Sequence, residues 1–96
     1  MLKTEEDLRK IVESIKIESR DPELNYGICA DFKVDSDLYR ADLVADLPGY
    51  GTECMIFKKA GDEILWDYLY SRNDIPFSED SLKECITEFI RTKYVD

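Results

Sequence analysis

The chain has 96 residues, 44% of them apolar, and its 22 acidic residues outnumber 13 basic residues to give a net charge of −9. A chain of this length holds one hydrophobic core, so residues 1–96 are predicted to form a single domain. The charge disfavours nucleic acid and anionic lipid as partners and favours a basic protein, although the same charge could serve solubility alone.

The first predicted element is a helix that begins after Thr4 and ends before Pro22. The Thr4 hydroxyl can accept a hydrogen bond from the backbone N–H of Asp7, and acidic residues follow at the positive end of the helix dipole. The residue before a proline is disfavoured in helical geometry, which ends the helix. The apolar residues recur at helical spacing and form one stripe: Leu8, Ile11, Val12 and Ile15.

Residues 25–72 are predicted to form a four-stranded antiparallel meander. The strands read NYGICADFKV, LYRADLVADL, TECMIFKK and EILWDYLYSR, and the breaks between them read DSD, PGYG and AGD. Pro48 with Gly49 suits the centre of a type II turn, and Gly61 suits the first central position of a tight hairpin. Asp35 and Asp37 favour a turn over a divalent metal site, because two neighbouring carboxylates are too few ligands.

Alternation in the first two strands separates an apolar face from an acidic face. We expect both helices to cover the apolar face, which carries Ile28, Phe32, Leu43 and Leu47. The opposite face carries Asp31, Asp42 and Asp46. A slip of one residue would bury the aspartates instead, so we expect the acidic face to be open to solvent.

Both faces of the last two strands are partly apolar. In the fourth strand, Leu65 and Leu69 alternate with aromatic residues at positions 66, 68 and 70. We favour the arrangement in which the leucines point to the core, because three buried rings with N–H and O–H groups are hard to satisfy in a small core. The opposite arrangement, with the rings in the core and Asp67 between two leucines on the far face, stays open.

A second helix is predicted after the linker that contains Pro76, with Ser78 or Ser81 as its cap. Its apolar stripe consists of Leu82, Cys85, Ile86, Phe89 and Ile90. The tail at 92–96 is expected to fray. The predicted fold class is therefore α+β, a two-layer domain in the order α-β-β-β-β-α with both helices on one face of the sheet.

The cysteines are predicted to be reduced thiols. Cys29, Cys54 and Cys85 are odd in number, far apart and outside any Cys-X-X-Cys motif, and Cys85 is expected to act as a small buried apolar residue. The first ten residues lack the apolar segment of a secretory signal, and no run of 18 apolar residues could span a membrane. These features favour a cytoplasmic protein.

No stretch predicts an enzyme, a cofactor or a metal site. Histidine is absent, so a Ser-His or Cys-His nucleophile is impossible within the chain. Asp42 and Asp67 could perform acid–base chemistry if the strands placed them together, but solvated surface is the simpler interpretation. No glycine-rich nucleotide loop or basic aromatic patch is present.

Binding of a basic protein is the remaining prediction. Two helices can cover one face of a four-stranded sheet and leave the other for a partner. Aromatic residues are enriched at interface cores, and acidic residues select a basic partner. The predicted partner-binding residues are Asp31, Asp35, Asp37, Asp42, Asp46, Tyr50, Trp66, Tyr68 and Tyr70.

In size, charge and helix–meander–helix order, the whole chain resembles the bacterial immunity proteins of contact-dependent and polymorphic toxin systems. The segment DLPGYGTECMIFKKAGDEILWDYLYSR carries most of the likeness. The resemblance implies a tight stoichiometric inhibitor of a cognate toxin, often a nuclease, whose basic active site an acidic surface can occupy. It implies no role for any individual residue.

Three other interpretations stay open. The chain could inhibit or act as a decoy for another nucleic-acid-binding protein, or it could be a homo-oligomeric domain that pairs through its open face or edge strand. A carboxylate-based enzyme is less favoured. The chain is expected to be a monomer or a homodimer.

Overall fold

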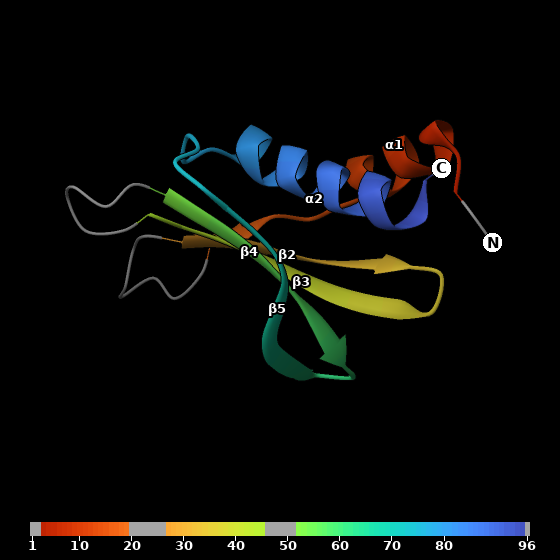
Figure 1. The fold of residues 1–96 in the computed structure, drawn as a ribbon, viewed down its shortest axis with the longest axis horizontal. Helices are drawn as coiled ribbons and strands as arrows, with labels where there is room; N and C mark the ends of the chain where they lie inside the picture. The colour runs from red at the N-terminus through yellow and green to blue at the C-terminus, as the bar shows by residue number, and fades with distance from the viewer. Residues whose placement is uncertain (1–2, 20–26, 46–51, 96) are drawn as a thin grey trace.

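The computed structural model describes residues 3–19, 27–45 and 52–95, and it has an α+β fold of two layers (Figure 1). As the sequence predicts, the two helices lie together on one face of an antiparallel sheet. The elements in chain order are α1 (Glu5–Glu13), β1 (Glu18–Ser19), β2 (Gly27–Val34), β3 (Asp37–Ala45), β4 (Thr52–Ala60), β5 (Glu63–Asn73) and α2 (Glu79–Tyr94).

The sheet is a meander in which each strand pairs with the next in sequence, in the order β1-β2-β3-β4-β5. The four predicted strands are β2 to β5, and the structure adds the short strand β1, which pairs with β2. The prediction that the first helix continues to Pro22 is wrong, because α1 ends at Glu13 and β1 lies within the range predicted to be helical. Asp35 and Gly61 lie in the turns after β2 and β4 with φ angles of 55° and 64°. Aspartate tolerates this left-handed geometry and glycine favours it. The predicted turn at 48–49 lies outside the described residues, as does Leu47.

Both helices begin at caps that the sequence predicts. The Thr4 hydroxyl accepts a hydrogen bond from the Asp7 N–H at 3.1 Å, and the Asp7 carboxylate accepts one from the Thr4 N–H at 3.0 Å. Ser78, rather than Ser81, caps α2, because its hydroxyl accepts from the Ser81 N–H at 3.1 Å. In the described part of the chain, neither helix is long and apolar enough to cross a membrane.

The core fills the space between the helices and the apolar face of the sheet. At its centre, the Phe89 ring lies 5.1 Å from the Tyr39 ring and 6.1 Å from the Phe32 ring, centroid to centroid. The predicted core face is confirmed for Ile28, Phe32 and Leu43. The buried members of the core are Leu8, Ala30, Phe32, Val34, Tyr39, Ala41, Leu43, Cys54, Ile56, Leu82, Cys85, Ile86, Phe89 and Ile90.

The two ends of the described chain lie side by side. The Lys3 N–H donates to the Tyr94 carbonyl at 2.7 Å, and Lys3 forms a parallel bridge with Val95. The Arg91 guanidinium donates two hydrogen bonds to Glu5, at 2.7 and 3.2 Å. The predicted fraying of the tail is therefore wrong as far as Val95, because these contacts hold the last turn of α2 in place.

Candidate functional site

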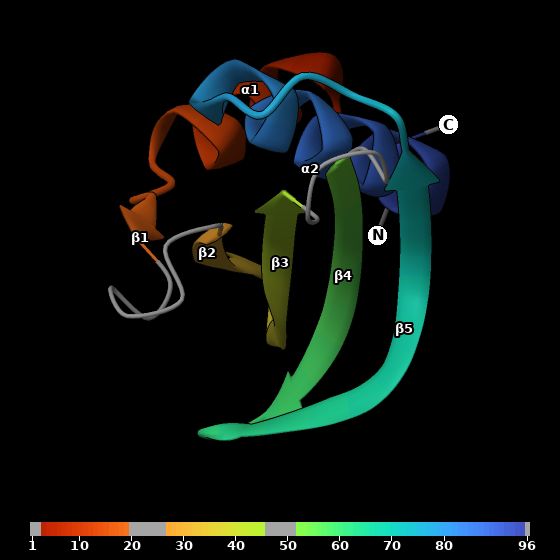
Figure 2. The same ribbon diagram turned by 90° about the vertical axis from the view of Figure 1, so that its left-hand side faces the viewer.

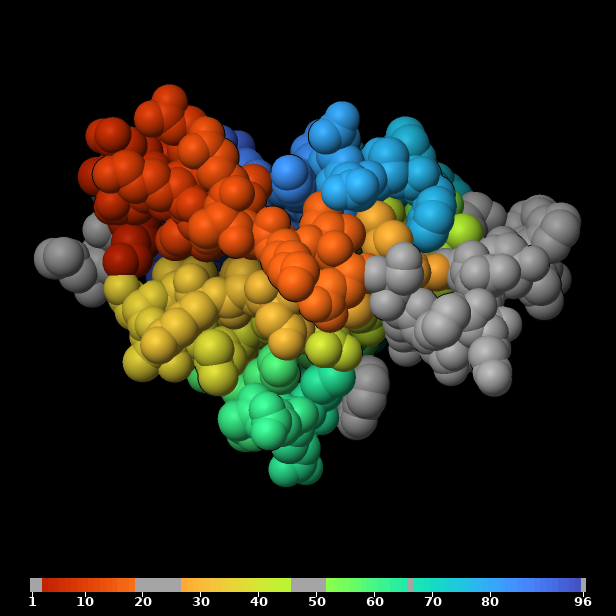
Figure 3. Space-filling view, turned by 180° about the vertical axis from the view of Figure 1, so that it is seen from behind, coloured from red at the N-terminus to blue at the C-terminus, as the bar shows by residue number. Residues whose placement is uncertain are grey.

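The outer ends of β4 and β5 form a hairpin that bends away from the helical layer (Figures 1 and 2). Ile56 pairs with Tyr70, whereas Lys58, two residues later, pairs with Leu65. Between these pairs, four residues of β5 therefore stand opposite a single residue of β4. Such a bulge increases the local twist and changes the direction in which side chains point. Beyond the bulge, the hairpin protrudes from the body of the molecule (Figure 3).

The hairpin exposes three large apolar side chains, which we call the hairpin patch: Leu65, Tyr68 and Leu69. Their exposed fractions are 44%, 59% and 48%. Large apolar groups that are exposed together and rimmed by polar residues are typical of interaction sites. Three exposed acids lie beside the patch and form what we call its acidic rim: Asp62, Glu63 and Asp67. Lys58, the cross-strand partner of Leu65, is also exposed, but its charge is paired with Asp37. The arrangement can therefore offer apolar anchors and negative charge to a protein partner.

The predicted places of Leu65, Leu69 and Tyr70 in β5 are wrong. Leu65 and Leu69 are exposed and are not part of the core. Tyr70, predicted on the far face, packs on α2 instead, with its ring centroid 6.2 Å from that of Phe89 and its hydroxyl donating to Glu88 at 3.1 Å. The bulge explains the error, because it interrupts the alternation on which the prediction depended.

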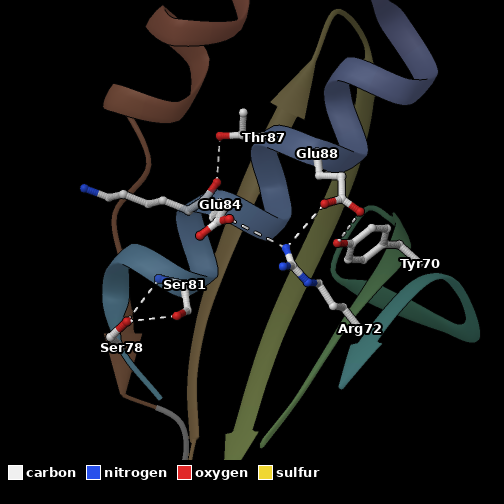
Figure 4. Close-up of polar contacts among 8 residues, drawn as sticks. Tyr70, Arg72, Ser78, Ser81, Glu84, Thr87 and Glu88 are labelled. Carbon is white, nitrogen blue, oxygen red and sulfur yellow. Dashed lines mark hydrogen bonds and ion pairs between the residues drawn. The ribbon is translucent and has the colours of Figure 1, made fainter. Parts of the chain in front are cut away.

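The inner half of β5 is tied to α2 by a polar cluster (Figure 4). The Arg72 guanidinium donates to Glu88 at 3.3 Å and lies 3.8 Å from Glu84, while the Tyr70 hydroxyl donates to the other oxygen of Glu88. Burial, with the nearby Cys85 and Glu88, raises the pKa of Tyr70. The phenol therefore keeps its proton and remains a donor, so the cluster fixes this half of the edge strand.

Asp31 lies on the far face of the sheet, as predicted, but its charge is already paired. Its carboxylate accepts hydrogen bonds from Arg40 and Lys59, each at 2.8 Å. Burial alone would raise the pKa of Asp31, but the hydrogen bonds from Arg40 and Lys59 lower it overall. A cation from a partner would have to compete with these two bonds.

Asp35 and Asp37 flank the predicted turn, which the structure confirms, and both contact cations of the chain itself. The Asp35 carboxylate lies 2.5 Å from the Lys3 ammonium. Asp37 accepts hydrogen bonds from the Tyr94 hydroxyl at 3.0 Å and from Lys58 at 3.3 Å. The bond from Tyr94, followed by that from Lys58, lowers the pKa of Asp37. These acids thus connect the turn to the ends of the chain.

The far face is not open around Asp42, contrary to the prediction. Asp42 is only 2% exposed, and Cys29, its neighbour in register on β2, is 7% exposed. Phe57 on the same face is 4% exposed. The β4–β5 hairpin curves beneath this face of the sheet (Figure 2). The prediction was wrong because alternation assigns side chains to the two faces of a sheet but does not predict its curvature.

The other predicted partner-binding residues stay predictions. Asp46, Tyr50 and the side chain of Trp66 lie outside the described part of the chain. The sequence interpretation missed Leu65 and Leu69 as exposed residues. The signal was present in Glu63 and Asp67, which alternate with Leu65 and Leu69 on the same face of the strand. A face that carries these charges is more readily solvated than buried.

A groove of about 680 Å³ lies between α1 and α2. Its charged residues bind one another, since Arg91 is bonded to Glu5, and Arg9 lies 3.9 Å from both Glu6 and Glu13. The groove therefore presents little unpaired charge to a ligand. Within the described residues, no group of three or more cysteine, aspartate or glutamate side chains is placed to hold a metal ion.

The hairpin patch and its acidic rim are thus the surface with the clearest capacity to bind. They combine exposed apolar side chains with negative charge on an element that projects from the fold. Comparison with known proteins adds no relative, because no family model, curated protein or solved structure matches the chain.

Proposed function

We propose that this chain is an acidic binding protein of the immunity type, which neutralises a basic toxin domain of the nuclease class by covering its substrate-binding surface. The hairpin patch carries the proposal. Leu65, Tyr68 and Leu69 expose roughly half of their side chains, although each could stabilise a core. A partner that removes these groups from water gains free energy in proportion to the apolar area that it covers, and aromatic anchors dominate such interfaces.

The charge around the patch fits a basic partner. Asp62, Glu63 and Asp67 are exposed beside it, and the chain as a whole carries a net charge of −9. A nuclease binds phosphates with cationic side chains, and carboxylates can occupy the positions of those phosphates. Exposed acids accelerate the encounter, while desolvated anchors slow dissociation, so the two sets of residues have separable roles.

The proposed interface differs from the predicted one. It keeps Tyr68 and gains Leu65 and Leu69, whereas Tyr70 and Asp42 leave it because both are packed within the domain. Asp31, Asp35 and Asp37 are already ion-paired within the chain, and exposed ion pairs contribute little energy. We therefore place these acids at the edge of the interface. Asp46, Tyr50 and Trp66 stay in the proposed interface as predictions from the sequence.

Co-expression with the product of the adjacent upstream gene tests the proposal. We expect a stable complex in a pull-down and rescue of growth from the toxicity of that product. Tyr68→Ala combined with Leu69→Ala should weaken binding by about 2 kcal/mol or more, which is the loss expected for interface anchors. Phe77→Ala is the matched control, since Phe77 is also 44% exposed but lies outside the hairpin.

The outcomes separate function from location. No complex and no rescue would refute the immunity proposal. A complex that tolerates the double substitution as well as it tolerates Phe77→Ala would retain the function and place the interface elsewhere. Rescue from an unrelated nucleic-acid-binding protein, without rescue from the upstream product, would favour the decoy interpretation.

A further inference from the structure

Cys54 of β4 and Cys85 of α2 face each other across the interface between sheet and helix. Both side chains are fully buried. Arg72 is the neighbour of Cys54 in the register of β5, and its guanidinium contacts Glu84 and Glu88 on α2 (Figure 4). Those two glutamates lie one residue before and three residues after Cys85. The contacts of Arg72 therefore bring the two cysteines to the same point of the core.

The two thiols also interact with each other. The hydrogen bond between them is the largest cause that raises the pKa of Cys54 and lowers the pKa of Cys85, while burial opposes ionisation of both. The positive charge of Arg72 favours ionisation of both. The first proton is therefore lost from Cys85, whose thiolate accepts a hydrogen bond from the Cys54 thiol. Thiolates are the reactive form of cysteine.

We propose that Cys54 and Cys85 form an oxidisable pair, which a peroxide converts to a disulfide that joins β4 to α2. The Cys85 thiolate attacks one oxygen of hydrogen peroxide, breaks the O–O bond and becomes a sulfenic acid, while hydroxide leaves and takes up the proton that Cys85 lost. The Cys54 sulfur then attacks the Cys85 sulfur, and the departing hydroxyl takes the Cys54 proton. Two thiols lose two electrons, and the peroxide becomes two water molecules.

The cross-link would close the segment between Cys54 and Cys85, which includes the hairpin patch. Closing a loop in the unfolded chain stabilises the folded state. Because both sulfurs are fully buried, the oxidant reaches Cys85 when α2 lifts from the sheet, and the disulfide forms once α2 packs against β4 again. The disulfide then prevents α2 from separating from the sheet again. The modification would therefore mark chains in which this local unfolding has occurred and would stop it from recurring. It needs no toxin partner and is independent of the proposed function.

Cys29 provides an internal control. It lies on the far face of the sheet, in register with Glu18 and Asp42, whereas the other two cysteines belong to the helix-covered core. Burial raises the pKa of its thiol. Cys29 is thus a buried thiol of the same chain, on the opposite side of the sheet from the proposed pair.

Peptide mapping of the folded protein tests the proposal, because trypsin places the three cysteines on separate peptides, 21–33, 41–58 and 84–91. The wild-type chain and Cys29→Ala are treated with hydrogen peroxide until the amide of residue 85 has exchanged its hydrogen, and remaining thiols are then blocked. We expect a reducible species that joins 41–58 to 84–91 and lacks two hydrogen atoms, in both proteins. The thermal midpoint should rise by about 10 °C or more and fall again with dithiothreitol.

A second variant follows the intermediate. In Cys54→Ala, the reaction should be slower, because Cys85 loses the hydrogen bond that favours its thiolate. It should stop at the sulfenic acid of Cys85, which dimedone traps on peptide 84–91. Recovery of Cys54 and Cys85 as thiols, or as separate sulfinic acids, from the folded wild-type chain would overturn the proposal. A cross-link to Cys29 would overturn it as well. The wild-type chain and Cys29→Ala decide the question even where Cys54→Ala does not fold.

Discussion

One hairpin has two halves with opposite properties. In the inner half, Cys54 and Ile56 of β4 are fully buried, and Tyr70 and Arg72 of β5 are bonded to α2. In the outer half, β5 exposes the hairpin patch and its acidic rim. The bulge between Ile56 and Lys58 separates them. A single irregularity in register thus divides two neighbouring strands into a part that stabilises the fold and a part that is free for a partner.

The largest effect should follow from a change in α2, in the core against which the inner half packs. Phe89→Ala removes the ring that packs against Tyr39, Phe32 and Tyr70, and we expect it to cost roughly 3–5 kcal/mol of unfolding free energy. Leu65→Ala in the outer half should change it by less than about 0.5 kcal/mol. Urea denaturation measures both. Equal shifts of the two midpoints would remove the distinction between the halves.

Charge reversal in the outer half should act on association. With Glu63→Lys and Asp67→Lys combined, we expect the association rate with a basic partner to fall by about tenfold at low salt, and the difference to shrink as salt screens the charges. The free energy of unfolding should stay nearly constant, because both residues are exposed. Stopped-flow association at several salt concentrations measures the effect. A salt-independent loss of binding would contradict the steering role.

Two tyrosines two positions apart provide a smaller and sharper test. Tyr70→Phe removes a hydroxyl that donates to Glu88 and should cost about 1 kcal/mol of unfolding free energy. Tyr68→Phe removes a hydroxyl from a side chain that is 59% exposed and should leave stability unchanged. Thermal or urea unfolding of the two variants in parallel measures the difference in their stability. The reverse order would mean that the bulge does not turn the strand as described.

The smallest expected effect is a change in how the free energy of unfolding falls at acid pH. The pKa of Asp31 is lowered in the folded chain, so its pairing stabilises the fold above the unfolded-state pKa of about 3.9, and this stability is lost as the pH falls through the folded-state pKa below it. Asp31 is about half exposed, so the contribution should stay below about 1 kcal/mol. Urea unfolding below about pH 4 should show a shallower loss in Asp31→Asn, with Lys59→Met intermediate.

Local chemistry made much of this fold predictable. The Thr4 cap, the stripe that contains Leu82 and Phe89, and the alternation of β2 and β3 all depend on residues a few positions apart. Such short-range patterns specify which face of an element is apolar. They therefore predicted the two helices, the meander and the helix-covered face of the sheet.

The features that the sequence did not predict depend on distant contacts or on irregular register. A strict alternation placed Leu65 and Leu69 in the core, because a bulge has no reliable sequence signal in a strand that is apolar on both faces. Cys54 and Cys85 seemed unrelated because their spacing is long, although packing brings them together. The tail was expected to fray because its partners, such as Lys3, lie at the other end of the chain.

The order of the strands has a kinetic consequence. Each strand pairs with its neighbour in sequence, so the sheet can assemble hairpin by hairpin through short loops, and each closure costs little chain entropy. The ion pair between Glu5 and Arg91 joins residues 86 positions apart and can form only after both helices have docked. Contacts that form after the transition state retard unfolding without accelerating folding. The contact between the two ends should therefore slow unfolding of the native state, while assembly of the meander determines the folding rate.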